Sequence, residues 1–302
     1  MKERAKSRLN FSGLYTAVIT PFAEKKVDYF ALSKIFEYQN KDFIKGLIIA
    51  GTTGEGCALT LTEKENLFNF ARTFYKNKIL IAGISSFSFY HLLEEVRIAV
   101  KIGMDGLLVT PPVYLKTNRD GIEKFYKTVV ENSRLPVIIY NVPSRTGYNL
   151  DIDILERLNK IDLVFAIKEC SGNFEYVLNI KKYTNLSILC GDDLLYLLYL
   201  MAGADGIVSV VSNIFPHLVH QMQKLFLANK IKRVQKLFSE SYEFIKSLFL
   251  EPNPIPIKFI MSYEGFCKEI YKLPLVPPSE KSKAKIISAY KKFKKKIKEL
   301  IE

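Results

Sequence analysis

A lysine follows four apolar residues in the stretch VFAIKECSG, which runs from Val164 to Gly172. Lysine is rarely buried unless it is paired or used in chemistry. Burial disfavours an ammonium and lowers its pKa, and the neutral amine is a nucleophile that can attack a ketone to form a Schiff base. We therefore predict a lowered pKa and imine chemistry for Lys168. The alternative is a strand that ends at Ile167, followed by a solvated lysine.

Imine chemistry needs a group that carries protons. The three histidines, His91, His217 and His220, fall in segments with helical spacing, which we place away from the reactive end of the fold. His217 and His220 have no acidic partner in a metal-ligand pattern, so we assign no metal site. Tyr140 lies in the apolar run that precedes the one with Lys168 and is the better carrier, although a pKa near ~10 requires a relay. The alternative for Tyr140 is an ordinary core aromatic.

The Gly-rich stretch GTTGEG, residues 51–56, follows another apolar run. Backbone N–H groups at such a turn can hold an anion, and the hydroxyl of Thr52 or Thr53 could complete a proton relay with Tyr140. A keto acid has the carbonyl and the carboxylate that this set of groups suits. Arg145 could hold a second carboxylate with two hydrogen bonds, with a surface salt bridge as the alternative.

Eight short apolar runs must position these residues, and a segment with helical spacing follows each of them. The runs are nearly continuous rather than alternating, as in parallel strands that are buried on both faces. One helical segment has Thr62 as the expected N-cap, with Glu65 completing a capping box. We predict an α/β fold: a (β/α)8 TIM barrel over residues 1–213 and a C-terminal helical region over 214–302. The predicted strands are 14–20, 46–53, 79–85, 106–112, 137–143, 164–169, 187–193 and 206–212.

Barrel enzymes carry their active sites at the carboxyl ends of the strands, where the residues above are expected to lie. Side chains alternate along a strand, so Val164, Ala166 and Lys168 should share one face. We expect this face to point into the barrel and Phe165 to face the helices. A doubly wound sheet is less favoured because no GxGxxG turn follows the first run.

The formal net charge of +13 over 302 residues is concentrated at the ends of the chain. Residues 1–8 contribute +3, and residues 281–302 contribute +7 from nine lysines, Glu299 and Glu302. The lysines near the C-terminus alternate with apolar residues at helical spacing, which indicates a solvated helix face. We therefore predict no nucleic-acid partner.

The longest central apolar run, residues 194–204, is shorter than the ~20 residues of a membrane span, so no membrane association is expected. The four cysteines form no CxxC pair, which favours free thiols in a reducing cytoplasm over a zinc site or disulfides. No secretory signal is recognised, whereas part of an organellar targeting sequence could be missing.

Several motifs in order carry a family resemblance: GTTGEG, YNVPSRTG (140–147), AIKECSGN (166–173), CGDD (190–193) and EPNPIPIKF (251–259). They resemble the dihydrodipicolinate synthases, which belong to the pyruvate-dependent class I aldolase family that includes N-acetylneuraminate lyase. The match runs from about Gly13 to Pro278. It implies condensation of pyruvate with L-aspartate 4-semialdehyde in the diaminopimelate route of lysine biosynthesis.

The resemblance also implies roles for individual residues. Lys168 would form the imine with pyruvate, so that no separate cofactor or metal is needed. Tyr140 would relay protons with Thr52, and Thr52 and Thr53 would help bind the pyruvate carboxylate. Tyr114 matches a tyrosine that the family inserts from a neighbouring subunit of a homotetramer, a dimer of dimers.

In the resemblance, Arg145 would bind the carboxylate of aspartate semialdehyde, which favours a synthase over an N-acetylneuraminate or keto-deoxy sugar-acid lyase. Gly191 and Val208 match positions that line the pyruvate pocket. The sequence departs from the lysine-inhibited members at Val113, where they have a tyrosine. It also departs at residues 56–58 and 85–87, where they have polar groups. We therefore predict weak or absent inhibition by lysine. A non-catalytic keto-acid-binding paralogue is the remaining alternative, which the joint presence of these residues disfavours.

Overall fold

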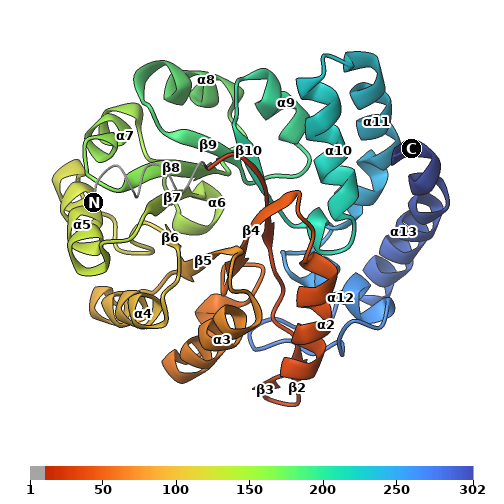
Figure 1. The fold of residues 1–302 in the computed structure, drawn as a ribbon, viewed down its shortest axis with the longest axis horizontal. Helices are drawn as coiled ribbons and strands as arrows, with labels where there is room; N and C mark the ends of the chain where they lie inside the picture. Colours follow the sequence, from red (N-terminus) through yellow and green to blue (C-terminus); the bar gives the residue numbers. More distant parts are fainter. Residues whose placement is uncertain (1–10, 302) are drawn as a thin grey trace.

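The computed structural model describes residues 11–301 and contains a closed barrel of eight parallel strands surrounded by helices (Figure 1). The strands follow one another around the barrel in the order β1-β10-β9-β8-β7-β6-β5-β4, which confirms the predicted fold class. A small antiparallel pair, β2 (Phe22–Ala23) and β3 (Lys26–Val27), lies outside it and was not predicted. The barrel strands are β1 (Gly13–Ala17), β4 (Ile44–Ile49), β5 (Ile79–Ile84), β6 (Gly106–Val109), β7 (Val137–Asn141), β8 (Val164–Glu169), β9 (Ser187–Cys190) and β10 (Gly206–Ser209).

The helices alternate with the strands along the chain and form an outer ring around the barrel (Figure 1). Those between the strands are α2 (Tyr29–Gln39), α3 (Leu61–Phe74), α4 (Phe89–Ile102), α5 (Arg119–Ser133), α6 (Pro143–Thr146), α7 (Ile152–Asn159), α8 (Phe174–Tyr183) and α9 (Tyr196–Met201). After β10 come α10 (Pro216–Leu227), α11 (Ile231–Ser247), α12 (Ile255–Tyr263) and α13 (Glu280–Ile301). Two 3₁₀ turns, η1 (Gly56–Ala58) and η2 (Val211–Asn213), follow β4 and β10.

Helix α3 begins two residues earlier than expected. Thr60, not Thr62, is the N-cap: its hydroxyl accepts a hydrogen bond from the backbone N–H of Glu63 at 3.2 Å. The Glu63 carboxylate in turn accepts one from the N–H of Thr60 at 2.9 Å. The prediction was wrong because the sequence offers two overlapping threonine–glutamate pairs with capping-box spacing, and the helix uses the first.

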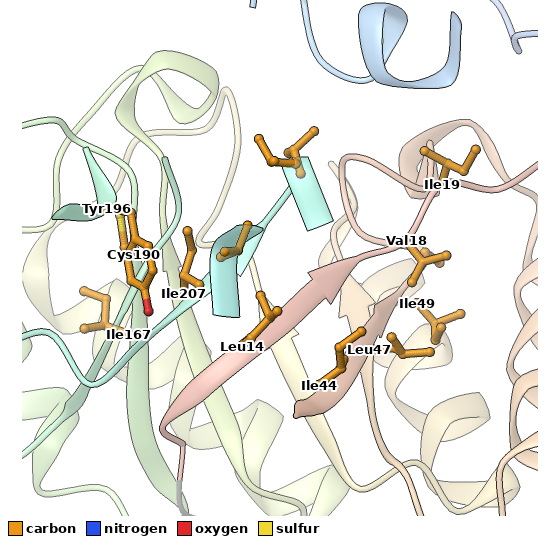
Figure 2. Packing of buried hydrophobic residues seen from close by; sticks show 14 of the residues in the cluster. Leu14, Val18, Ile19, Ile44, Leu47, Ile49, Ile167, Cys190, Tyr196 and Ile207 are labelled. Carbon is orange, nitrogen blue, oxygen red and sulfur yellow. The ribbon is translucent and has the colours of Figure 1, made fainter. Parts of the chain in front are cut away.

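The barrel wall is apolar on both faces, which explains the continuous apolar runs. Figure 2 shows part of the outer layer, in which Leu14, Leu47 and Ile207 lie among the buried side chains of the larger cluster. A second cluster fills the barrel interior. Its buried members are Phe11, Tyr15, Ala17, Ile48, Ile81, Leu108, Ile138, Tyr140, Val142, Ala166, Leu189 and Val208.

Strand β8 contains an irregularity that changes the orientation of its first residues. Val137 of β7 pairs with Val164, but the next residue pairs with Ala166, so Phe165 is an extra residue of the kind found in a β-bulge. Val164 accordingly packs in the outer cluster and Phe165 against the inner one, and the orientations predicted for these two residues were wrong. Beyond the bulge the predicted alternation holds, with Ala166 in the inner cluster and Ile167 in the outer one.

Helix α13 packs against α11 and α12 at the edge of the molecule (Figure 1). Its apolar stripe is buried, and Phe293 stacks on Phe244 of α11 with ring centroids 5.3 Å apart. Some lysines on the opposite face pair with neighbouring carboxylates, as Lys296 does with Glu240 at 2.8 Å. The large hydrophobic cluster continues from the barrel into these helices, and the boundary placed at residue 213 stays a prediction. Over residues 11–301, no helix has both the length and the apolar character needed to cross a membrane.

Candidate active site

Lys168 and Tyr140 lie side by side on neighbouring strands at the carboxyl end of the barrel. The register of β7 and β8 pairs the two residues directly. Both are buried, with 5% and 7% of their surfaces exposed, and Lys168 Nζ lies 4.4 Å from the centroid of the Tyr140 ring. The structure therefore places an amine and a phenol in contact inside the barrel.

The pKa of Lys168 does not fall as predicted. Burial lowers it, but the electrostatic interactions with Tyr140 and Cys170 outweigh burial, so the pKa is raised above its ordinary value. An ammonium next to an aromatic ring is stabilised relative to the neutral amine. Lys168 is therefore protonated at neutral pH and must lose a proton before it can act as a nucleophile.

The loop after β4 presents one of its two threonines to a cavity and anchors the other. Thr53 is buried, and its hydroxyl accepts a hydrogen bond from Asn253 Nδ2 at 2.9 Å. Thr52 lines a cavity together with Tyr140. The loop is held by Glu55, whose carboxylate forms a buried ion pair with Lys258 of α12. These contacts join the Gly-rich loop to the C-terminal helices.

The cavity measures about 470 Å³ and opens where the barrel strands end. Arg145, in the short helix α6, lines it and donates a hydrogen bond from Nη2 to the backbone oxygen of Asn253 at 3.0 Å. Within residues 11–301 no ion pair occupies the guanidinium. Asn253 contacts both Thr53 and Arg145, yet sequence reasoning gave it no role, although it lies in the quoted EPNPIPIKF motif.

His91 also lines this cavity, so its predicted place away from the reactive end was wrong. Helix α4 starts at Phe89, which puts His91 in its first turn, directly after the carboxyl end of β5. Residues 56–58 and 85–87 line the same part of the cavity, together with Glu95. Burial raises the pKa of Glu95, while its ion pair with Lys64 acts in the opposite direction. By contrast, His217 and His220 pack on Phe43 with ring centroids 4.7 and 4.5 Å away.

Gly191 lies against the stem of Lys168, and neither residue is among those that line the cavity, so the pocket-lining role of Gly191 stays a prediction. A Cβ added to Gly191 would come within 2.8 Å of Lys168 Cε. Val208 is fully buried in the inner cluster, below these groups. Asp193, two residues after Gly191, accepts hydrogen bonds from the Ser209 hydroxyl and from the backbone N–H of Val210, and burial raises its pKa to about 6.

Of the predicted site residues, Thr52, Tyr140 and Arg145 line the cavity, whereas Lys168, Thr53, Gly191 and Val208 do not. Tyr114 also lies away from the cavity of its own chain. It is 84% exposed in the loop after β6, with a φ of 69°, and it does not line the cavity. Its neighbour Leu115 is 66% exposed. The site that one chain forms therefore contains Lys168, Tyr140 and Thr52, but not Tyr114.

A closed parallel barrel with a lysine and a tyrosine in contact at the carboxyl ends of its strands has the form of a TIM-barrel enzyme. The model of the dihydrodipicolinate synthetase family matches residues 10–293. A 4-hydroxy-tetrahydrodipicolinate synthase from Rickettsia bellii is 38% identical over 279 residues, covering 91% of this chain and 95% of that protein. The chain belongs to the dihydrodipicolinate synthetase family.

Solved structures agree with this assignment. The 4-hydroxy-tetrahydrodipicolinate synthase of Methylacidiphilum fumariolicum SolV superposes with a TM-score of 0.93 at 32% identity, covering 96% of this chain and 98% of that chain. The dihydrodipicolinate synthase of Acinetobacter baumannii, solved in complex with pyruvate, has a TM-score of 0.90 at 28% identity, with 94% and 99% covered. The chain thus has 4-hydroxy-tetrahydrodipicolinate synthase activity, a lyase activity of lysine biosynthesis.

Proposed function

We propose that the chain condenses pyruvate with L-aspartate 4-semialdehyde through a Schiff base on Lys168. After losing a proton, Nζ attacks the ketone carbon of pyruvate, and loss of water gives the imine. The protonated imine withdraws electrons, so the pyruvate methyl group loses a proton and the resulting enamine attacks the aldehyde. The contact between Lys168 and Tyr140 carries the proposal, and the pyruvate in the A. baumannii relative supports the choice of keto acid. No cofactor beyond this imine is required.

The remaining residues are proposed to have the roles that the family resemblance implies. Tyr140 carries the protons and Thr52, which shares the cavity, extends the relay. Thr53, Gly191 and Val208 shape the pyruvate site around the lysine. Borohydride reduction in the presence of pyruvate tests the mechanism, because it should fix the pyruvate-derived group on the peptide that contains Lys168. Modification of a different lysine, or of none, contradicts the imine.

Arg145 is the proposed site for the carboxylate of aspartate semialdehyde. We expect Arg145→Ala to lower kcat/KM for this aldehyde by about a hundredfold or more, since the charge-assisted hydrogen bonds to the substrate carboxylate are lost. Imine formation with pyruvate alone should change little. Arg145→Lys should recover only part of the loss because lysine lacks the planar two-donor geometry. Steady-state kinetics with the aldehyde varied measures the effect.

Arg233→Ala is the matched control, since Arg233 is exposed on α11, a helix that does not line the cavity. It should leave the kinetics unchanged. Equal kcat/KM for aspartate semialdehyde in Arg145→Ala and wild type would mean that Arg145 does not bind the acceptor. That result would favour the alternative acceptors, the neuraminate or keto-deoxy sugar-acid substrates.

We also propose that the chain works in the cytoplasm as a homotetramer. The exposed Tyr114 is available to enter the relay of a neighbouring subunit, which would complete a site that one chain leaves without it. Exposed apolar side chains on α8 and α9, among them Leu178 at 44% and Met201 at 67%, provide a second surface for association. Two such surfaces suit a dimer of dimers.

Weak or absent inhibition by lysine stays a prediction. Val113, Cys57 and Phe87 replace the polar groups that the resemblance associates with a lysine pocket, and all three line the cavity. Apolar groups cannot satisfy the ammonium and carboxylate of a bound lysine, which would be left unpaired. We expect the rate to stay nearly constant up to millimolar lysine. Half-inhibition at micromolar lysine would show that other groups in the cavity bind it.

A further inference from the structure

Asn253 contacts two groups that the proposed function assigns to different substrates. Its side-chain amide donates a hydrogen bond from Nδ2 to the hydroxyl of Thr53 at 2.9 Å, and its backbone oxygen accepts one from Arg145 Nη2 at 3.0 Å. Thr53 is assigned to the carboxylate of pyruvate, and Arg145 to the carboxylate of the aldehyde. One residue, which itself lines the cavity, therefore contacts both groups that are proposed to bind a carboxylate.

The backbone on both sides of Asn253 is restricted. Pro252 and Pro254 flank it in the turn between α11 and α12, and a proline limits its own φ and the conformation of the residue before it. The oxygen of Pro252 accepts a hydrogen bond from the N–H of Ile255, the first residue of α12, at 2.9 Å. Asn253 thus presents its amide from a turn that has little freedom to move.

The polarity of the bond between Asn253 and Thr53 determines what the hydroxyl can do. An amide nitrogen only donates, so the hydroxyl oxygen accepts and its own proton is left for another partner. Within residues 11–301 the hydroxyl of Thr53 donates to no other group. The carboxylate of a bound keto acid is an acceptor that suits this proton. The bond from Asn253 limits the rotation of the hydroxyl and so the directions in which the proton can point.

The other end of the Asn253 amide has no partner. Its Oδ1 is buried and, over the described part of the chain, receives no hydrogen bond. An unsatisfied buried acceptor lowers stability, so the side chain is not placed for maximal stability. A residue that served stability alone would be expected to satisfy both ends of its amide. The contact with Thr53 therefore points to a role in the site.

We propose that Asn253 is a positioning residue for pyruvate, whose amide orients the hydroxyl of Thr53 so that the hydroxyl donates its proton to the pyruvate carboxylate. This role rests on the proposed function, in which Thr53 helps to bind that carboxylate. A hydroxyl that is already oriented loses less freedom when the substrate binds, and its bond to a charged acceptor is strong. The contact with Arg145 uses the backbone oxygen of Asn253 and does not depend on the side chain.

The variant Asn253→Ala separates the two contacts. We expect KM for pyruvate to rise by about tenfold, the effect of one oriented hydrogen bond, with kcat nearly unchanged. KM for L-aspartate 4-semialdehyde should stay at its wild-type value, because alanine keeps the backbone oxygen that contacts Arg145. If Asn253 only maintained the turn, its loss would release Thr53 and Arg145 together and raise both KM values. That pattern, or an unchanged KM for pyruvate, overturns the proposal.

The variant Asn253→Asp distinguishes the hydrogen bond from packing. Aspartate has nearly the same size and shape, but its carboxylate cannot donate and instead accepts the proton of Thr53. KM for pyruvate should therefore rise at least as much as in Asn253→Ala. Packing alone predicts that the aspartate variant behaves as wild type does, and this result would contradict the proposal.

A double-mutant cycle with Thr53→Val tests whether Asn253 acts through the hydroxyl. Valine keeps the branched shape of threonine but lacks the hydroxyl, so Thr53→Val should itself raise KM for pyruvate. Adding Asn253→Ala should then change KM little further, because no hydroxyl remains to be oriented. Full additivity of the two effects would show that Asn253 influences pyruvate by another route, which also contradicts the proposal.

Asn132→Ala is the matched control. Asn132 is exposed on α5, outside the cavity, and its Nδ2 donates to the backbone oxygen of Thr128 at 2.8 Å. This variant also loses an amide that donates one hydrogen bond, but it should keep both KM values at the wild-type level. A rise in KM for pyruvate equal to that of Asn253→Ala would show that the effect is not specific to Asn253.

Borohydride trapping separates this proposal from the proposed function. At saturating pyruvate, wild type and Asn253→Ala should both yield the adduct on Lys168. At low pyruvate, the variant should need about tenfold more pyruvate for the same yield of adduct. An equal dependence on pyruvate in the two proteins removes the role of Asn253 and leaves the imine mechanism intact. No adduct in wild type removes the mechanism itself.

Discussion

Lys168→Met is expected to lower kcat by about ten-thousandfold, because it removes the nucleophile and with it the imine that makes the pyruvate methyl group acidic. Methionine keeps an unbranched stem of similar length above Ala166, so the barrel interior should remain filled. The thermal unfolding midpoint should therefore stay within a few degrees of wild type. Residual turnover near that of wild type would show that another group forms the covalent intermediate.

The pH dependence of the wild-type enzyme should reflect the protonation of Lys168. Because the pKa of Lys168 is raised, the protonated form dominates at neutral pH, and kcat/KM for pyruvate should rise as the pH increases toward that pKa. The ammonium also contributes to stability at neutral pH, and this contribution is lost only as the pH rises through the raised pKa. In Lys168→Met the alkaline loss of stability should be smaller. Unfolding followed at neutral and alkaline pH measures the difference.

The barrel was predictable because its strands are buried on both faces, which leaves continuous apolar runs in the sequence. The residues at which several strands end were not predictable from the sequence. The run at 46–53 was read as one strand, but β4 ends at Ile49. Beyond that residue the chain leaves the ladder to form the loop with Thr52. Apolar composition does not record where backbone pairing stops.

The central contact of the site was predictable from alternation along β8 and the order of the strands. The direction in which the pKa of Lys168 shifts was not predictable, since it depends on which groups lie near the amine. The extra residue at Phe165 escaped prediction because a bulge leaves the apolar pattern unchanged. Asn253 escaped because its partner Thr53 is 200 residues away in sequence.

Lys258→Met is expected to destabilise the protein by about 3–5 kcal/mol, the cost of leaving a buried carboxylate without its partner. The side chains of Lys258 and Glu55 are both fully buried and form an ion pair. Lys258 Nζ lies 4.2 Å from the centroid of the Phe22 ring and donates to the oxygen of Ile270 at 3.2 Å. Glu55 also accepts from the backbone N–H of Lys272 at 2.8 Å. Without Lys258, the carboxylate keeps only its backbone donor.

The effect should extend to catalysis, because Glu55 belongs to the loop that presents Thr52 to the cavity and adopts a φ of 54° there. A loop released from α12 no longer holds the hydroxyl of Thr52 in place, so kcat should fall together with the unfolding midpoint. Urea unfolding and steady-state kinetics on the same preparations measure the two losses.

Two further variants test whether the unpaired charge of Glu55 causes the loss of stability in Lys258→Met. Glu55→Gln combined with Lys258→Met removes both charges and should recover much of the stability, since the penalty comes from the unpaired charge. Lys296→Met breaks an ion pair with Glu240 in which the side chains are 47% and 37% exposed. An exposed pair contributes about 0–1 kcal/mol, so this variant should unfold almost as wild type does. If Lys258→Met were as stable as Lys296→Met, the carboxylate of Glu55 would have found water or a proton in place of the lysine, and the loop would not depend on this pair.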